Sequence, residues 1–288
     1  FLIENKIKEK DRIAAYTVNQ IETVESFLAT SAIGAIWSSC SPDFGTQGVI
    51  ERFSQIKPKL LIITDRYYYN GKEINIIQRL NEILKTIKSI KTVIIVNYPG
   101  KKLLNYKKLE KIKFINLRNI KKLNTKEIFF EKFDFDHSIS ILYSSGTTGK
   151  PKCICHRSGG VLLQHLKEHQ LHCEINPGDN IFYFTTCGWM MWNWLVSSLA
   201  SKASIVLFDG SPMYKNKDLL IKIAEKEKIT LLGVSAKYID SLKKFGIKTI
   251  SKYKLKKLKT ICSTGSPLSK DGFEFVYKNI KKNVHLAS

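Results

Sequence analysis

The sequence lacks the features that mark membrane-spanning, secreted and repeat proteins. No apolar run approaches the length of a bilayer-crossing helix, and no charged segment followed by an apolar one resembles a secretory signal. No internal repeat occurs either. The cysteines form no C-x-x-C pair and have no regular spacing, so we expect reduced thiols in a soluble, cytoplasmic protein. They are Cys40, Cys153, Cys155, Cys173, Cys187 and Cys262.

Acidic residues are scarce, with 25 Asp and Glu against 47 Lys and Arg, for a formal net charge of +22. From 243 to 259 there are eight lysines and no acid, and from 85 to 132 there are fourteen basic residues and three glutamates. This excess is almost entirely Lys among Ile, Leu and Asn, without the aromatic stacking positions or Arg-rich elements of a nucleic-acid module. We therefore expect solvated faces that attract anionic metabolites, and no nucleic-acid or membrane partner.

What the chain does have is a regular alternation of short apolar segments with longer amphipathic ones. At 288 residues and 43% hydrophobic content it can bury a large core. Short buried strands separated by helix-length segments are typical of parallel sheets covered by crossover helices, so the predicted fold class is α/β. Strands are predicted at 12–16, 35–39, 59–64, 92–96, 138–143, 180–184, 204–208, 230–234 and 258–263, and helices at 21–35, 158–171, 217–229 and 235–247.

Residues 144–152, "SSGTTGKPK", contain two glycines and four hydroxyl-bearing Ser and Thr residues directly after a predicted apolar strand. Glycines allow close approach, Ser and Thr add donors, and lysines add charge, so a strand, this loop and a following helix would form a phosphate cradle. It is not a Walker A loop, because only two residues separate Gly146 from Gly149 and Pro151 follows Lys150. A polar surface turn is the simpler alternative.

Two further clusters have an ordinary explanation and a functional one. His165 and His169 stand four apart on a predicted helix, a spacing that can bind zinc, but the acid of H-E-x-x-H is missing and an ordinary helix face explains them. We assign no residue to a metal. The three tryptophans of "CGWMMWNW", 187–194, would by default belong to the core.

The motif "YSSGTTGKPK", 143–152, resembles the phosphate loop of the adenylate-forming acyl-CoA synthetase superfamily. Other segments look like the acetoacetyl-CoA synthetases within it, and together they cover most of the chain. These are "GAIWSSCSPDFG" at 34–45, "HLKEHQLHCEINPGD" at 165–179, "TTCGWMMWNWLVSSL" at 185–199, "LFDGSP" at 207–212 and "STGSPL" at 263–268.

The resemblance implies a two-step ligase. A carboxylate, most simply acetoacetate, attacks the α-phosphorus of ATP in the presence of Mg²⁺, and coenzyme A then takes the acyl group from the adenylate. By the same resemblance the β- and γ-phosphates are held by one loop, in which Lys150 falls at a variable position. The matching residues are Ser144, Ser145, Gly146, Thr147, Thr148, Gly149 and Lys152.

Two more sites follow from the resemblance. An acyl and coenzyme A pocket is implied at Trp189, Met190, Met191 and Asn193, where the amide of Asn193 offers a hydrogen bond to a 3-oxo group. The adenine is implied to lie against Gly265, Ser266 and Pro267.

The chain departs from the superfamily pattern at its ends. We expect residues 1–288 to be part of the large N-terminal domain, with a lobe boundary near 100–135 and without the small C-terminal domain. The catalytic lysine and the acidic residues for Mg²⁺ and ribose are expected beyond Ser288, so we expect the fragment to be inactive alone. The alternatives are an acetyl- or propionyl-type ligase and a non-catalytic nucleotide-binding module.

Overall fold

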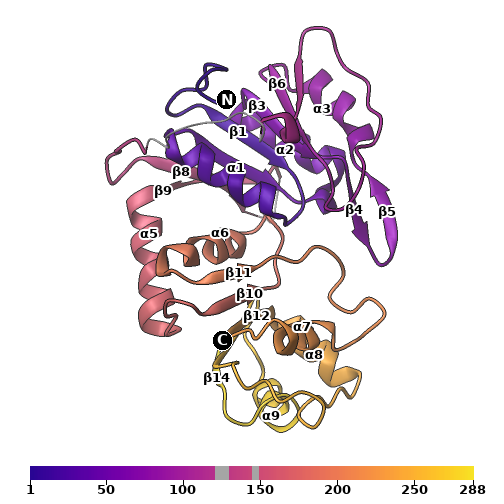
Figure 1. Cartoon of the computed structure of the whole chain (residues 1–288), viewed down its shortest axis with the longest axis vertical. Coiled ribbons are helices and arrows are strands. Elements are labelled where there is room, and N and C mark those ends of the chain that lie inside the picture. The colour runs from indigo at the N-terminus through magenta and orange to yellow at the C-terminus, as the bar shows by residue number, and fades with distance from the viewer. Residues whose placement is uncertain (121–129, 145–148) are drawn as a thin grey trace. The chain divides into compact units, whose positions relative to one another are not determined.

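The chain divides into two compact units. A computed structural model of residues 1–288 describes residues 1–120, 130–144 and 149–288. The first unit is Phe1–Leu162 with Thr186–Met190, and the second is Leu163–Thr185 with Met191–Ser288 (Figure 1). The stretch 100–135, where the sequence suggested a lobe boundary, falls inside the first unit. Within the described residues no helix is both long and apolar enough to cross a lipid bilayer.

The first unit is built on a seven-stranded sheet. Its described strands run in the order β7 (Lys113–Asn116), β6 (Thr92–Val96), β3 (Leu60–Thr64), β1 (Arg12–Tyr16), β2 (Ile36–Cys40), β8 (Ser138–Ser144) and β9 (Lys152–Arg157). Neighbours pair in parallel except β8 and β9, which are antiparallel. A separate hairpin joins β4 (Arg66–Tyr69) to β5 (Lys72–Asn75). Because β2 and β3 flank β1 on opposite sides, the strand order reverses at β1, where α/β sheets bind ligands beyond the carboxyl ends.

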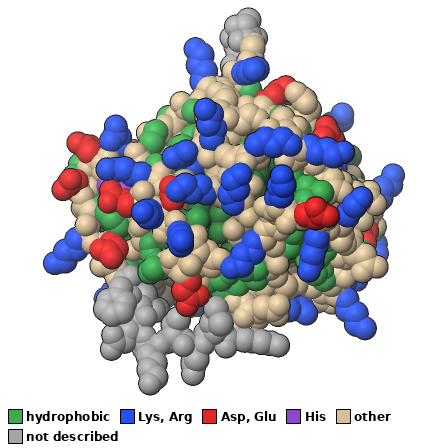
Figure 2. Space-filling model, turned by 90° about the horizontal axis from the view of Figure 1, so that it is seen from above, with side chains coloured by type: hydrophobic (Ala, Val, Ile, Leu, Met, Phe, Trp, Pro, Cys, Tyr) green, Lys and Arg blue, Asp and Glu red, His purple; other side chains and the backbone are tan. Residues whose placement is uncertain are grey.

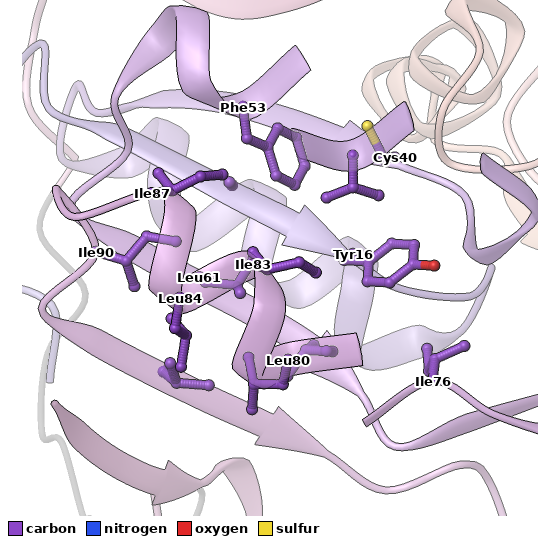
Figure 3. Close-up of a cluster of buried hydrophobic side chains, with 14 of the residues drawn as sticks. Tyr16, Cys40, Phe53, Leu61, Ile76, Leu80, Ile83, Leu84, Ile87 and Ile90 are labelled. Carbon is purple, nitrogen blue, oxygen red and sulfur yellow. The ribbon is translucent and has the colours of Figure 1, made fainter. Parts of the chain in front are cut away.

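Helices cover both faces of this sheet. Helix α1 (Ile21–Ala32) packs through Phe27 on Trp37, with ring centroids 5.9 Å apart. Helices α2 (Gly45–Ile56) and α3 (Leu80–Thr86) cover the other face, where Phe53 and Ile83 point toward Tyr16 (Figure 3). Trp37, Phe53 and Ile83 are fully buried, and the burial of each such side chain stabilises the unit by about 1.5–3 kcal/mol. The short helices are η1 (Pro42–Phe44), η2 (Ile77–Arg79) and α4 (Leu117–Ile120).

The second unit has a five-stranded parallel sheet of its own, in the order β11 (Ser204–Val206), β10 (Asn180–Tyr183), β12 (Leu231–Ser235), β13 (Thr260–Thr264) and β14 (His285–Ala287). Alternate residues of β10 point to opposite faces. Phe182 joins the cluster under α7 (Leu219–Lys226), α8 (Ala236–Lys244) and α9 (Lys270–Asn279). Tyr183 joins the cluster around Trp194 of α6 (Met190–Ser197).

The predicted α/β class is confirmed, and each predicted strand and helix has a counterpart within a few residues. The helix predicted at 158–171 is α5 (Ser158–Leu166) continued by the π-helical turn η3 (Lys167–His172), and η4 (Ser198–Ser201) extends α6. One expectation is wrong. No helix follows the glycine-rich loop directly, because β9 intervenes and pairs back onto β8.

Candidate active site

The residues of the predicted phosphate loop connect β8 to β9 along the chain. Ser144 ends β8 and Lys152 begins β9, and the two residues are register partners. Ser145, Gly146, Thr147 and Thr148 lie outside the described residues. Gly149 adopts φ +97°, a conformation that a residue with a side chain adopts only under strain. Apart from its chain neighbours, no atom of the described residues lies within 4 Å of the position that a Cβ would take there. The loop thus leaves and re-enters the sheet at adjacent positions.

The side chain of Gln55, in helix α2, forms hydrogen bonds with residues of this hairpin. The Gln55 amide donates to the Pro151 carbonyl oxygen at 2.9 Å, and the Cys153 thiol donates to Oε1 of Gln55 at 3.6 Å. The side chain of Lys152 is exposed beside them. Because β9 separates the loop from the amino end of α5 along the chain, anion binding at the loop depends on its own groups and on nearby side chains such as Lys152.

Trp189 is held at the carboxyl edge of the same sheet. The Cys187 thiol donates to the carbonyl oxygen of Thr17, just after β1, at 2.7 Å. The Ser39 hydroxyl of β2 donates to the Cys187 carbonyl oxygen. The Trp189 side chain remains 57% exposed, and its ring lies 6.3 Å from that of Phe44. The core interpretation therefore fails for Trp189, although it holds for Trp192 and Trp194, which are buried.

Sequence reasoning missed Arg52, which lies between Phe44, the ring neighbour of Trp189, and Tyr143, the residue before the phosphate loop. Its guanidinium lies 4.2 Å from the Phe44 ring centroid and 5.8 Å from that of Tyr143, the residue before Ser144. The Ser38 hydroxyl donates to the Tyr143 hydroxyl at 3.0 Å, while burial raises the pKa of Tyr143, so the ring stays neutral. No local signal in the sequence marks Arg52, because Tyr143 is brought to it from strand β8, far along the chain.

The remaining predicted pocket residues differ in burial. Met190 is 45% exposed in the first unit, and Met191 packs partly buried against the Trp194 cluster of the second. Asn193 is only 7% exposed. Both atoms of its side-chain amide are buried, and neither has a hydrogen-bond partner among the residues the structure describes.

Gly265, Ser266 and Pro267 form an exposed turn directly after β13 in the second unit. Gly265 has φ +87°, which reverses the chain there before Leu268, whose N–H donates to the Ser288 hydroxyl at 3.1 Å. The position at the carboxyl end of a central parallel strand is one at which α/β sheets bind ligands.

The histidine pair belongs to the core of the second unit. The Nδ1 atom of His165 lies 2.7 Å from the Ser197 hydroxyl, and His169 is fully buried with its ring edge-on to Trp194 at 4.2 Å. Burial lowers the pKa of His169 to about 4, with a further contribution from His165. In the described part of the chain, no group of three or more His, Cys, Asp or Glu is arranged to hold a metal ion.

Comparison with known proteins shows the family of the chain. The model of the family described as AMP-binding enzyme matches residues 1–286. The chain belongs to the AMP-binding enzyme family. Residues 144–152 and 265–267 both lie within the stretch that matches this family.

Several members of the AMP-binding family resemble the chain along nearly its whole length. An acetoacetyl-coenzyme A synthetase of Rhizobium meliloti is 47% identical over 96% of the chain and 42% of the relative. One of Gallus gallus is 44% identical over 98% of the chain and 43% of the relative. The solved structure of an acetoacetyl-CoA synthetase from Streptomyces lividans is 35% identical, with a TM-score of 0.91 over 99% of the chain and 43% of that protein. The chain thus spans under half the length of these relatives.

Proposed function

We propose that the protein containing this chain activates acetoacetate with ATP and transfers the acyl group to coenzyme A. The observation that carries the proposal is the resemblance along 96–99% of the chain to proteins named acetoacetyl-CoA synthetase. Because the chain spans 42–43% of their length, the complete reaction is proposed for a protein of their full length.

In the first step the carboxylate oxygen of acetoacetate bonds to the α-phosphorus of ATP, and the bond to pyrophosphate breaks. The demand on the protein is to neutralise negative charge that moves onto the leaving pyrophosphate. We assign this to the loop 144–152 and the ammonium of Lys152, supported by the strain-prone conformation of Gly149 and the open space around it. Arg52 adds a second positive charge that stacks on Tyr143 beside the loop.

Mg²⁺ supplies charge neutralisation when it enters with the ATP phosphates. The described residues contain no cluster suited to hold a metal ion, so no residue of this chain is assigned to it. The adenine is proposed to lie against the turn Gly265–Ser266–Pro267, whose exposed backbone is free of bulky neighbours at Gly265.

The acyl group is proposed to be recognised by Asn193. A buried amide without partners costs about 1–3 kcal/mol, and native proteins rarely keep one without a ligand or water. The 3-oxo group of acetoacetate accepts a hydrogen bond, which the amide N–H₂ of Asn193 can donate. Trp189, exposed at the edge of the first unit, is proposed to border the acyl group and the thiol of coenzyme A.

The test is AMP release by the full-length protein with acetoacetate, acetate, propionate and butyrate. Butyrate matches acetoacetate in chain length but lacks the 3-oxo group, so we expect acetoacetate to have the highest kcat/KM. Asn193→Leu should lower kcat/KM for acetoacetate about tenfold to a hundredfold and leave butyrate nearly unchanged. Leu199→Met, at an exposed residue of η4 that belongs to none of the proposed sites and forms no side-chain hydrogen bond, is the matched control.

Each alternative predicts another result. A strong preference for acetate or propionate would identify a different short-chain ligase. Tight ATP binding with no AMP release from any acid would identify a non-catalytic nucleotide-binding module. An RNA- or DNA-binding protein would bind nucleic acid with a steep salt dependence. Figure 2 shows Lys and Arg scattered over the face it displays, interspersed with acidic residues, as expected for a solvated surface.

A further inference from the structure

The helix that carries Asn193 is held by side chains of a neighbouring helical segment within the second unit. The indole N–H of Trp194, the residue after Asn193, donates to Oε2 of Glu168 in the π-helical turn η3 at 2.8 Å. The other oxygen of this carboxylate, Oε1, accepts from the Gln164 amide at 2.6 Å. We propose that Glu168 is a positioning residue, which through Trp194 sets the direction in which Asn193 faces the acyl group.

The spacing of the contacts explains why they fix the rotation of α6 about its own axis. His165, Glu168 and His169 follow one another at helical spacing along α5 and η3, and all three contact α6. The contacted residues of α6 are Trp194 and Ser197, which are three positions apart and so share one side of that helix. A helix held at two positions on one side cannot rotate without breaking both contacts. The direction of the amide at the position before Trp194 is therefore fixed as well.

Of these contacts, the hydrogen bond from Trp194 to Glu168 is the one that a substitution can remove most selectively. The Ser197 hydroxyl donates its one hydrogen to the Trp194 carbonyl oxygen at 2.9 Å, so it accepts from Nδ1 of His165 at 2.7 Å. The His169 ring packs edge-on to the indole. Neither contact provides an acceptor for the buried indole N–H, and buried tryptophans usually have one. Glu168 provides it.

This assignment rests on the proposed function, in which the Asn193 amide donates to the 3-oxo group of acetoacetate. Neither amide atom of Asn193 has a hydrogen-bond partner in the described part of the chain, so its direction depends on the position of α6. A displacement of about 1 Å in a substrate-positioning group can cost about a hundredfold in rate. Butyrate has no 3-oxo group, so its activation should depend much less on the contact between Glu168 and Trp194.

The test is the ratio of kcat/KM for acetoacetate to that for butyrate, measured by AMP release with the full-length protein. Glu168→Leu should lower this ratio about tenfold to a hundredfold. Glu168→Gln should keep it, because its amide oxygen still accepts from the indole N–H. Trp194→Phe, which removes the N–H and keeps an aromatic ring, should match Glu168→Leu, and the double variant should lose no more than either. Gln170→Leu is the matched control, since it removes a contact of 3.3 Å from the same turn to Ser201 of η4.

The ratio separates positioning from folding, because a variant that only folds less well loses activity with both acids alike. An unchanged ratio in Glu168→Leu would overturn the proposal, and so would a Glu168→Gln as impaired as Glu168→Leu. If Glu168→Leu does not fold, Trp194→Phe decides, and an unchanged ratio there overturns the proposal too. A wild type that does not prefer acetoacetate would refute the proposed function itself, and this assignment with it, before any variant is compared.

Discussion

Replacement of Asp65 by Ala should destabilise the first unit far more than removal of an exposed partner of the same ion-pair network. Asp65 follows β3 and is fully buried. Its carboxylate accepts hydrogen bonds from the N–H groups of Tyr98 and Leu104, each at 3.0 Å, and from the Arg66 guanidinium at 3.0 Å. The side chain thus fastens the loop after β6 to the end of β3. Arg66, itself only 7% exposed, would lose its buried partner.

The expected loss follows from what remains after the substitution. Removing one member of a buried pair costs about 3–5 kcal/mol, because the other charge stays buried without compensation. Arg66 keeps a second partner, Glu73, at 3.1 Å, so we expect the lower end, about 3 kcal/mol. The Glu73 side chain is 41% exposed, and Glu73→Ala should cost only about 1 kcal/mol or less.

Urea denaturation of both variants measures the free energies of unfolding, and amide hydrogen exchange gives a local readout. Protection at the amides of Tyr98 and Leu104 should fall in Asp65→Ala and persist in Glu73→Ala. The reasoning is refuted if the two variants lose equal stability, or if these two amides remain as protected in Asp65→Ala as in the wild type.

Three further outcomes are expected. Gly149→Ala should cost about 1–3 kcal/mol, because φ +97° strains any side chain, and should weaken ATP binding in calorimetry; Gly160→Ala, in α5 with open space at its Cβ, should instead stabilise by about 0.5–1 kcal/mol. His169→Phe should flatten the pH dependence of stability. In the folded chain His169 has a pKa of about 4, whereas a His in the unfolded chain has a pKa near 6.5. The unfolded state therefore binds the proton first as the pH falls, so the free energy of unfolding is highest above about pH 6.5 and drops by about 3 kcal/mol toward pH 4. If urea denaturation gives the same change of unfolding free energy with pH for wild type and variant, this expectation is wrong. Arg52→Gln should raise the KM for ATP in AMP release by the full-length protein. Arg52→Lys should raise it less, because Lys retains the positive charge and loses only the planar stacking. An unchanged KM in Arg52→Gln would show that Arg52 does not belong to the site.

Much of the fold could be predicted because its strands are buried on both faces. Segments such as 60–64 and 92–96 are wholly apolar or nearly so, and every residue in them is buried, which is the pattern that parallel strands produce. Strand β9 has the opposite character. Its sequence, KCICHR, is mostly exposed at the sheet edge, and its only strand partner among the described residues is β8. Local sequence therefore carried little signal for β9, and the hairpin was mistaken for a loop that leads directly into a helix.

The residues of the candidate site could likewise be predicted only in part. Ser144 and Lys152 could be selected from sequence because their motif is unusual in composition, and Trp189 because its segment resembles the acetoacetyl-CoA synthetases. Arg52 could not be, since its importance comes from stacking on Phe44 and Tyr143, residues brought to it by helix α2 and strand β8.

Asn193 and His169 show why a buried polar group points to a ligand in one case and not in the other. His169 is fully buried beside Trp194, but its lowered pKa keeps the ring uncharged, and a neutral imidazole packs edge-on to the indole as an aromatic core residue. Both ring nitrogens of His169 also lack a hydrogen-bond partner among the described residues, but its ring packs on Trp194, whereas the amide of Asn193 is polar at every pH and has no aromatic surface to pack. A hydrophobic residue of similar size would remove that cost without disturbing α6. Retention of the amide in the core of this helix is therefore best explained by a partner that arrives with the substrate.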